Sequence, residues 1–504
     1  MSQSKPGFLT PQCGTLAFTL PALAVKVSHL YLPSCLHSLL SFLAQLTLSA
    51  GGCIDYTNIQ YGAQLNFAAF GMNAGHDGQT GFDFFLNHPE VITDFGYRSL
   101  HIEALVGKAV TQAYYGKKAK YNYYNGCSTG GRQGFGNAPN YPDDFDGMLL
   151  GSPGIDWLHI VSSKGILAHR IGWPNLNSSA YVRPEQWPAI VAAIVAFLDP
   201  MDGVTDGIID EPTRLRFDPA ILGCGLGVLN ASMCLTPPQI QSVRSAYEPI
   251  ADTAGVIVYP SFELGSDTSV FSQNQLNGQP QLSYTILQDY WRGAVYNSST
   301  WTPLSFNETD MDFAVSINPG RVNVGETDLS TFYAHGHKII SYHGRNDPTV
   351  TSGLSERYFA GVAQSVNLTI DEMHSFYRLF FLPGMHHCSG GPGAWDVGQT
   401  FPLDGVTSKE DHNVLLSLVE WVEGGNAPGY VVGTKYMGDN SSLPVLAQRS
   451  KLLILFEMLG KRMIMLTMMT AHCVYPNVSR WDGVGNTTLA SSWNCVAPGM
   501  FNYY

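Results

Sequence analysis

The amino-acid sequence predicts an α/β fold in which a long inserted segment divides the core. Strand-like and helical patterns alternate up to about residue 154 and again after about residue 327. A glycine-flanked serine stands where a strand would turn sharply into a helix. Between these two parts tryptophans, prolines and loops accumulate, and the alternation fades. We therefore predict a core from residues 1–154 and 328–504, with an inserted domain at 155–327.

The amino-acid composition indicates a globular protein and argues against nucleic-acid binding. Of the 504 residues, 45% are hydrophobic and 13% are charged, which is typical of a globular chain rather than a disordered one. The formal net charge of −13 argues against a nucleic-acid partner, because nothing would offset the phosphate repulsion. The nine cysteines do not fall in C-x-x-C metal pairs.

N-glycosylation sequons favour a secreted protein with oxidised cysteines. Single sequons are often accidental, but this chain has them at Asn177, Asn230, Asn297, Asn307, Asn367, Asn440, Asn477 and Asn486. The polar start at Met1–Gly7 shows no signal peptide. The apolar run Leu452–Met469 is interrupted by Glu457, Lys461 and Arg462, so we expect no membrane span there.

The elements of the first half follow from apolar spacing. Apolar residues recur at helical intervals from Ile102 to Tyr114, and Gly116 stops the run. This helix leads into a short aromatic strand at Tyr121–Tyr124. A further strand is expected at Gly147–Leu150. The Leu/Ser run Leu36–Leu48 has no clear partner, and residues 1–50 look atypical for a core.

In the second half, the alternation resumes with two strand-like segments at Lys338–His343 and Phe376–Leu382. An amphipathic helix follows from Val414 to Val422, which Asp411 could cap and Gly424 ends.

The sequence Gly126-Cys127-Ser128-Thr129-Gly130 fits G-x-S-x-G, the nucleophile elbow. Its glycines let strand and helix approach closely, so that the serine hydroxyl stands exposed. The N-terminus of a helix at Arg132–Asn137 would favour a developing negative charge. The motif alone is equally compatible with a turn that carries a surface serine.

A serine nucleophile needs a histidine base and an acid that orients it, and α/β-hydrolases carry them in the order serine, acid, histidine. Asp347 follows the strand at Lys338–His343, where such an acid would lie. The structural alternative is an aspartate in a turn before Pro348, which is a common role.

Two cysteines strengthen the catalytic interpretation. Cys127 precedes Ser128, and Cys388 follows His387. If these cysteines are paired, a disulfide would hold Ser128 and His387 close together, because it keeps its two Cα atoms roughly 4.4–6.8 Å apart. His386 is the competing base, and this adjacency favours His387. Cys127 is itself a candidate nucleophile, which an oxidising compartment disfavours.

These residues resemble the secreted fungal tannase and feruloyl esterase family. The Cys-Ser, Asp, His-Cys arrangement is its distinctive signature, and similar stretches cover roughly 51–449 and the tail from residue 472. The sequence after Ser128, Thr-Gly-Gly-Arg-Gln, looks more like the feruloyl esterase B branch than the tannase branch. Further similar stretches are Gly52–Tyr56, Gly75–Gly78, Tyr141–Gly147 and Cys388–Gly393.

The resemblance implies an α/β-hydrolase core with a large inserted lid domain, and hydrolysis of plant phenolic esters. It assigns Ser128 as nucleophile, His387 as base and Asp347 as orienting acid. It also implies a Cys127–Cys388 disulfide. Thr129 N–H is the expected oxyanion donor, and a second donor is expected near residues 50–52.

The segment from Asp199 to Ile208 has carboxylates at offsets 0, 3 and 7 with glycines between them, which suits a hard cation. The alternative is a solvated acidic turn. The family resemblance implies a structural calcium ion in the lid. Its ligands would be the side chains of Asp199, Asp202 and Asp206 and the carbonyls of Val204 and Ile208.

The chain also departs from the family pattern. Leu198 and Leu215 stand where the family has a cysteine pair, and an apolar contact could replace that bridge. Residues 450–471 read as an insertion. Cys224–Cys234 and Cys473–Cys495 are expected pairs, and Cys13, Cys35 and Cys53 form an odd set.

We therefore expect a secreted serine carboxylesterase acting on feruloyl or related esters of plant cell-wall polysaccharide. One alternative is a tannase acting on galloyl esters. An alternative of another class is an inactive secreted protein whose N-terminal core is damaged.

Overall fold

The computed structural model describes residues 41–46, 54–77, 84–267, 271, 275–276, 279–280, 285–400, 407, 412–436, 439 and 469–498. Cys13, Cys35, Cys53 and the segment expected to give a second oxyanion donor lie outside these residues. So do Asn440 and most of the predicted insertion at 450–471.

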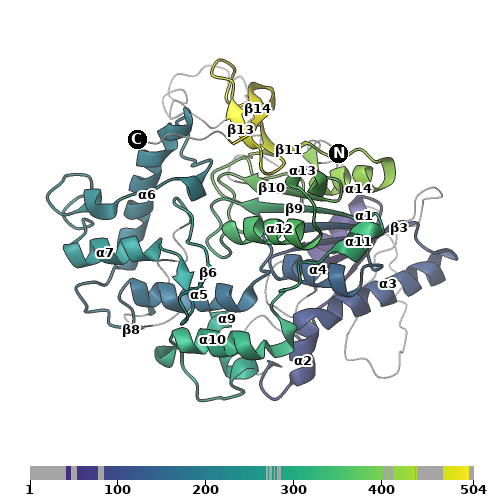
Figure 1. Ribbon diagram of the computed structural model, residues 1–504, viewed down its shortest axis with the longest axis horizontal. Coiled ribbons are helices and arrows are strands. Elements are labelled where there is room, and N and C mark those ends of the chain that lie inside the picture. The colour runs from purple at the N-terminus through teal and green to yellow at the C-terminus, as the bar shows by residue number, and fades with distance from the viewer. Residues whose placement is uncertain are drawn as a thin grey trace, which may run out of the picture.

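The core is one six-stranded sheet in which every strand pair is parallel (Figure 1). The strand order is β10-β9-β4-β3-β1-β2. The chain runs from β1 to the edge strand β2, returns to β3 beside β1, and continues through β4 and β9 to β10 at the other edge. The strands predicted near 121, 147, 338 and 376 are confirmed. The six strands are β1 Ser41–Leu46, β2 Ala68–Gly71, β3 Tyr121–Cys127, β4 Gly147–Gly151, β9 Lys338–Gly344 and β10 Tyr377–Leu382.

The strand β1 corrects one expectation. We expected no sheet partner for Leu36–Leu48, yet β1 lies within this run and pairs with both β2 and β3. The strand was missed because inner strands of a parallel sheet read as continuous apolar runs without polar alternation. The last residues of the predicted insertion at 450–471 are described: β12 (Met469–Cys473) begins there and pairs with β11 (Tyr430–Thr434), while the insertion itself stays a prediction.

Helices cover both faces of the sheet. One face packs against α3, α4, α11 and α12, and its buried cluster includes Leu100, Phe135 and Phe359. The other face packs against α1 and α14 around Tyr61, Tyr123 and Leu415. The helices are α1 Tyr56–Gln64, α3 Ser99–Tyr115, α4 Thr129–Asn140, α11 Ser330–Ala334, α12 Gly353–Ser365, α13 Ile370–Met373 and α14 Val414–Gly424.

The predicted ends of α3 and α14 can be compared with the structure. Gly116 ends α3 in the left-handed conformation, with φ 70°, as predicted. The predicted cap of α14, Asp411, was wrong, because Asn413 caps the helix by accepting a hydrogen bond from Leu416 N–H. The helix ends at Gly424 as predicted, and Gly425 follows in the left-handed conformation. The N-cap is thus shifted by two residues, which is the usual error in helix boundaries.

The segment between β4 and α11 lies beside the sheet (Figure 1). Its buried apolar side chains form a core of their own. Trp187, Trp291 and Phe306 are buried in this cluster, which also takes in Phe95 from before α3. The domain boundaries at 154/155 and 327/328 stay a prediction. Its helices and strands are α5 Trp157–Arg170, α6 Trp187–Leu198, α7 Pro237–Ala246, β5 Ile250–Ala251, β6 Ile257–Tyr259, β7 Gln275–Leu276, β8 Gln279–Pro280, α9 Thr285–Tyr290 and α10 Glu308–Ile317. The short α2 (Pro89–Thr93) precedes α3.

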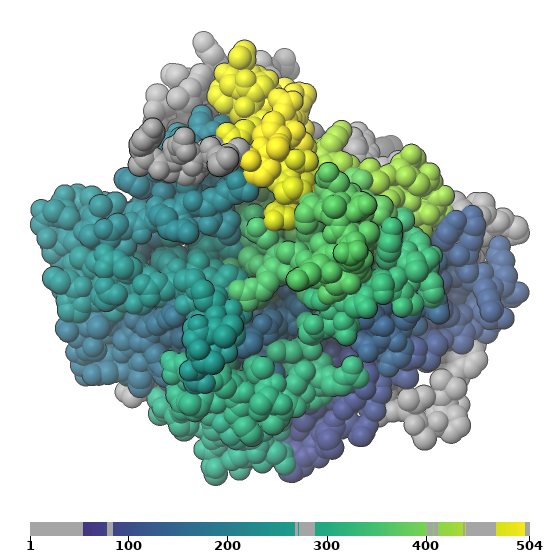
Figure 2. Space-filling model, in the orientation of Figure 1, coloured from purple at the N-terminus to yellow at the C-terminus, as the bar shows by residue number. Residues whose placement is uncertain are grey.

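The C-terminal hairpin of β13 (Val478–Trp481) and β14 (Trp493–Val496) lies against both the inserted segment and the second half of the core (Figure 2). Trp493 packs in one cluster with Val204 of the inserted segment. The disulfides Cys224–Cys234 and Cys473–Cys495 form as expected. Among the residues that the structure describes, no helix combines the length and apolarity that a membrane span requires.

Candidate active site

Ser128 stands at the turn between β3 and α4. Its backbone has φ 62° and ψ −118°, a conformation that non-glycine residues rarely adopt and that is typical of strained functional turns. Hydrogen bonds hold the turn, because Ser128 N–H donates to Gly151 O at 2.9 Å and Ser128 O accepts from Gly154 N–H at 3.1 Å. A Cβ at Gly126 would come within 2.8 Å of the Gly130 backbone, so this close approach requires glycine.

The structure brings Asp347, His387 and Ser128 into one line of hydrogen bonds. Asp347 follows β9 and His387 follows β10, so all three lie at the carboxyl edge of the sheet. His387 Nδ1 donates to Asp347 Oδ2 at 2.7 Å, and its Nε2 lies 2.7 Å from Ser128 Oγ. This geometry leaves Nε2 free to accept a proton from the serine hydroxyl.

Asp347 is fully buried. Burial alone raises the pKa of this carboxyl, but the charge of His387 and hydrogen bonds from His343 and His387 hold the pKa well below its usual range. Its Oδ1 also accepts from Thr349 N–H at 2.8 Å and from Val350 N–H at 2.9 Å. These two bonds fix the carboxylate so that Oδ2 faces the imidazole.

Cys127 and Cys388 form a disulfide with a Cα–Cα distance of 6.1 Å. The bridge joins the residue before Ser128 to the residue after His387, and 261 positions separate the two cysteines. Cys127 is therefore not a free thiol. The neighbouring His386 makes no hydrogen bond to Ser128 among the described contacts, and burial lowers the pKa of its imidazole.

Thr129 begins α4, so its N–H is one of the helix's unshared amide groups beside Ser128. This position suits the oxyanion donor predicted from the elbow. The side chain of Thr129 is buried, and its hydroxyl has no hydrogen-bond partner among the described residues.

His343 was missed by the sequence reasoning. It is fully buried in β9, and its Nε2 lies 3.4 Å from Asp347 Oδ2. Its Nε2 also donates to Val350 O at 2.9 Å, and its Nδ1 accepts from Ser355 Oγ at 2.7 Å. The only sequence signal for this contact is the spacing of four residues between His343 and Asp347. That spacing brings the two side chains together only because β9 ends between them.

Lys164 of the inserted segment was also missed. Its buried Nζ donates to Thr349 O at 2.7 Å and to Pro348 O at 3.2 Å, directly after Asp347. Burial lowers the pKa of this ammonium to about 7, although the charges of Asp347 and Glu263 oppose the shift. The inserted segment thus contacts the loop that carries the candidate acid, through a contact between positions 164 and 349 that no local pattern indicates.

The acidic segment at 199–208 forms a compact loop after α6. Asp199 is 4% exposed and accepts from Asp206 N–H and Gly207 N–H at 2.9–3.1 Å. Asp202 and Asp206 each accept from the amide two residues further on, at 2.8 Å. The donor set is all oxygen and partly buried, which fits a hard cation such as calcium.

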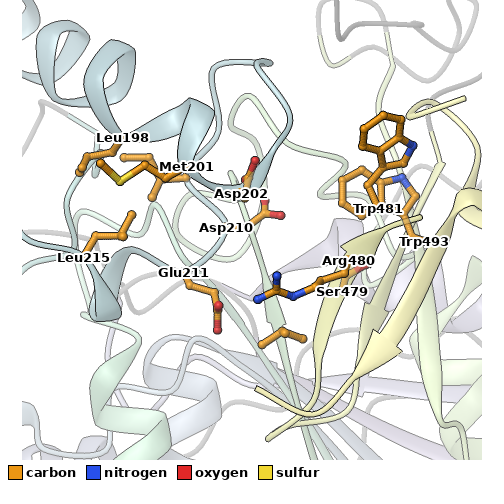
Figure 3. A pocket seen from close by; sticks show the side chains of 12 residues that line it. Leu198, Met201, Asp202, Asp210, Glu211, Leu215, Ser479, Arg480, Trp481 and Trp493 are labelled. Atoms are coloured by element: carbon orange, nitrogen blue, oxygen red, sulfur yellow. The ribbon is translucent and has the colours of Figure 1, made fainter. Parts of the chain in front are cut away.

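A pocket lies between this loop and the C-terminal hairpin (Figure 3). Asp210 and Glu211 stand on one side, and Arg480 points toward them from β13. Leu198 and Leu215 both line the pocket and belong to one apolar cluster, which agrees with an apolar contact in place of a bridge. None of Ser128, Asp347 and His387 lines this pocket.

The chain resembles known proteins in sequence and in fold. A family model described as "Tannase and feruloyl esterase" matches residues 51–496. A protein named "Probable feruloyl esterase B-2" from Aspergillus flavus is 37% identical over 402 residues, which cover 79% of this chain and 75% of that protein. A protein of the same name from Neosartorya fischeri is 35% identical over 445 residues, covering 88% and 79%.

Solved structures give a similar result. The crystal structure of feruloyl esterase B from Aspergillus oryzae matches with a TM-score of 0.79 and 31% identity, covering 90% of this chain and 84% of that chain. A tannin acyl hydrolase from Aspergillus niger has a TM-score of 0.69 at 19% identity, covering 91% and 81%, and this likeness shows a shared fold.

Proposed function

The chain belongs to the tannase and feruloyl esterase family of carboxylic ester hydrolases, and we propose that it is a serine esterase of feruloyl or related hydroxycinnamoyl esters of plant cell-wall polysaccharide. The observation that carries the serine mechanism is the line of two 2.7 Å hydrogen bonds that joins Asp347, His387 and Ser128. The feruloyl preference rests on the names of the relatives that are 31–37% identical to this chain.

In the proposed reaction, Ser128 Oγ attacks the ester carbonyl while its proton passes to His387 Nε2. Asp347 stabilises the imidazolium and keeps Nδ1 protonated. Thr129 N–H donates to the oxyanion of the tetrahedral intermediate. The C–O bond to the alcohol then breaks, and His387 gives its proton to the leaving oxygen. Water attacks the acyl-enzyme by the same route and releases the acid and free Ser128.

We further infer an α/β-hydrolase core in which the inserted segment serves as a lid. The parallel sheet, the elbow after β3 and the order serine, acid, histidine support the core. The contact of Lys164 with the carbonyls beside Asp347 supports the lid, since it places the inserted segment next to the candidate site.

The test is hydrolysis of methyl ferulate beside methyl gallate, with Ser128→Ala as the inactive variant. We expect hydrolysis with a higher kcat/KM for ferulate, and a loss of at least about 10³-fold in the variant, as for other serine triads. A higher kcat/KM for gallate would make the protein a tannase. Folded protein without activity on either ester would support the inactive alternative.

We propose that Asp199, Asp202, Val204, Asp206 and Ile208 hold a structural calcium ion. The all-oxygen donor set and the burial of Asp199 support this, because a buried carboxylate is costly unless hydrogen bonds or a cation offset its charge. The ion would crosslink the loop and leave the ester chemistry to the triad. Chelation with EGTA should lower Tm, and added Ca²⁺ should restore it. An Asp206→Asn variant that keeps the same calcium-dependent Tm would contradict the site.

We also propose that the protein is secreted and glycosylated. Seven of its eight sequon asparagines lie in described segments; six are exposed, and the seventh, Asn477, is partly exposed. Three disulfides agree with an oxidising compartment. Peptide mapping of protein secreted from a fungal host should find glycans at several of these sites. Protein retained in the cell without glycans would contradict the proposal.

A further inference from the structure

A cluster of two histidines and one aspartate lies at the edge of the sheet opposite the triad. Asp143 is in the loop between α4 and β4, and His335 and His337 are in the turn between α11 and β9. One nitrogen of each imidazole and one oxygen of the carboxylate all lie within 4.8 Å of one another. We propose that Asp143, His335 and His337 form a binding site for a divalent transition ion of the zinc class.

The fold brings these residues together through one strand pair. Gly147 at the start of β4 is paired with Lys338 at the start of β9. Asp146 O accepts from Lys338 N–H at 3.0 Å, which ties the two incoming loops to each other. The ligands are therefore held at the ends of two rigid strands, although about 190 positions separate Asp143 from the histidines.

The distances suit a tetrahedral ion after a small adjustment. His335 Nδ1 lies 2.9 Å from Asp143 Oδ1, so these two ligands already converge. Ligand atoms around zinc are about 3.4 Å apart, given bond lengths of about 2.0–2.1 Å. The side chains of Asp143 and His335 are 84% and 41% exposed, and these exposed rotamers can move apart to admit an ion. Water would fill the fourth position.

His337 is the buried member, with 15% of its side chain exposed. Its Nε2 is buried and has no hydrogen-bond partner among the described residues. Its Nδ1 lies 3.9 Å from Asp146 Oδ1. Metal-ligating histidines commonly donate their second ring N–H to a carboxylate, so Asp146 would orient the ring and leave Nε2 for the ion.

The local charge also favours a cation. Asp143, Asp144 and Asp146 bring three carboxylates to this loop. Lys108 is the nearby opposing charge, and its Nζ donates to Asp143 O at 3.0 Å. The carboxylates therefore outnumber the ammonium group at the place where the imidazoles converge.

The two nitrogen ligands distinguish this site from the loop at 199–208. Calcium prefers oxygen donors, whereas imidazole suits zinc, copper and nickel. We expect zinc to bind at the histidine cluster while the acidic loop is filled with calcium. Because the cluster lies at the amino ends of β4 and β9, the ion would clamp the two incoming loops and leave ester hydrolysis unchanged.

The test is calorimetric titration of the metal-stripped full chain with Zn²⁺ in excess Ca²⁺, at a pH of about 7.5, where a histidine of ordinary pKa is mostly neutral. We expect one saturable site and a rise in Tm with zinc. His335→Gln and Asp143→Asn should each weaken zinc binding by at least about tenfold, as loss of a ligand does. The control is His88→Gln, which removes an exposed histidine elsewhere.

The site would be overturned if the wild-type chain does not bind zinc. It would also be overturned if His335→Gln and Asp143→Asn bind zinc as strongly as the wild type. His335 and Asp143 are exposed, so their variants should fold. Hydrolysis of an activated ester such as p-nitrophenyl acetate by each variant, together with its Tm without zinc, would confirm this. Calcium titration should give the same curve for wild type and His335→Gln.

Discussion

Asp347→Asn probes the site because the structure dictates which way the new amide must turn. Oδ1 of Asp347 accepts two backbone N–H groups, from Thr349 and Val350. An asparagine must keep its carbonyl oxygen there, since an NH₂ group cannot accept these bonds. Its NH₂ then faces His387 Nδ1, which has to become the acceptor. His387 would carry its proton on Nε2, pointing at Ser128, and could no longer take the serine proton.

The wrong tautomer predicts a large effect on turnover. Holding the base in this tautomer lowers kcat by about 10⁴-fold in serine triads, equivalent to about 5.4 kcal/mol of barrier. KM should change little, because Asp347 is fully buried and does not reach the substrate. The assay is steady-state hydrolysis of methyl ferulate, with Tm measured for each variant.

The matched control is Asp371→Asn, an exposed aspartate at the start of α13, which should keep wild-type kcat. A folded Asp347→Asn variant that loses less than about tenfold in kcat would refute the reasoning, because its base would then be working without the required tautomer.

Three further predictions concern the groups around the site. Replacing both Cys127 and Cys388 with alanine should lower the free energy of unfolding by about 5.6 kcal/mol, because the unfolded chain regains the entropy that closure of a 261-residue loop removes. The variant should also have a lower kcat. An unchanged urea unfolding curve would contradict this prediction. Burial lowers the pKa of Lys164 from 10.5 to about 7, so the folded state disfavours the charged ammonium. This loss of folding stability is complete below pH 7, and the free energy of unfolding rises with pH from 7 to 10.5. Lys164→Met should flatten that slope in unfolding curves, and an equally steep slope would contradict the assignment. Arg132 is fully buried and donates to the carbonyls of Phe95, Gly96 and Val322. Arg132→Met should therefore lower the free energy of unfolding by roughly 3 kcal/mol or more, measured by chemical denaturation. A loss under about 1 kcal/mol would show that these carbonyls find other partners.

Much of the site could be predicted from sequence because its signals are local. The elbow around Ser128 dictates strand, turn and helix over a few residues. The flanking Cys127 and Cys388 then connect two distant segments covalently, which spacing alone could not do. Strands near 338 and 376 placed Asp347 and His387 at one sheet edge.

The remaining features depend on contacts that sequence does not display. The strand β1 was missed because its Leu/Ser run shows no alternation, although it pairs with β2 and β3. His343 and Lys164 reach the acid loop only through tertiary packing. Likewise, Asp143 and His335 meet only because β4 and β9 are neighbours in the sheet.

Trapping the acyl-enzyme would show directly whether Ser128 is the nucleophile. The protein would be mixed with a slowly hydrolysed feruloyl ester, quenched in acid and digested, and its peptides measured by mass spectrometry. We predict a feruloyl adduct on Ser128, enriched in an Asp347→Asn variant if deacylation slows more than acylation. An adduct on another residue would contradict the assignment of Ser128 as nucleophile. So would a Ser128→Ala variant that hydrolyses methyl ferulate at the wild-type rate.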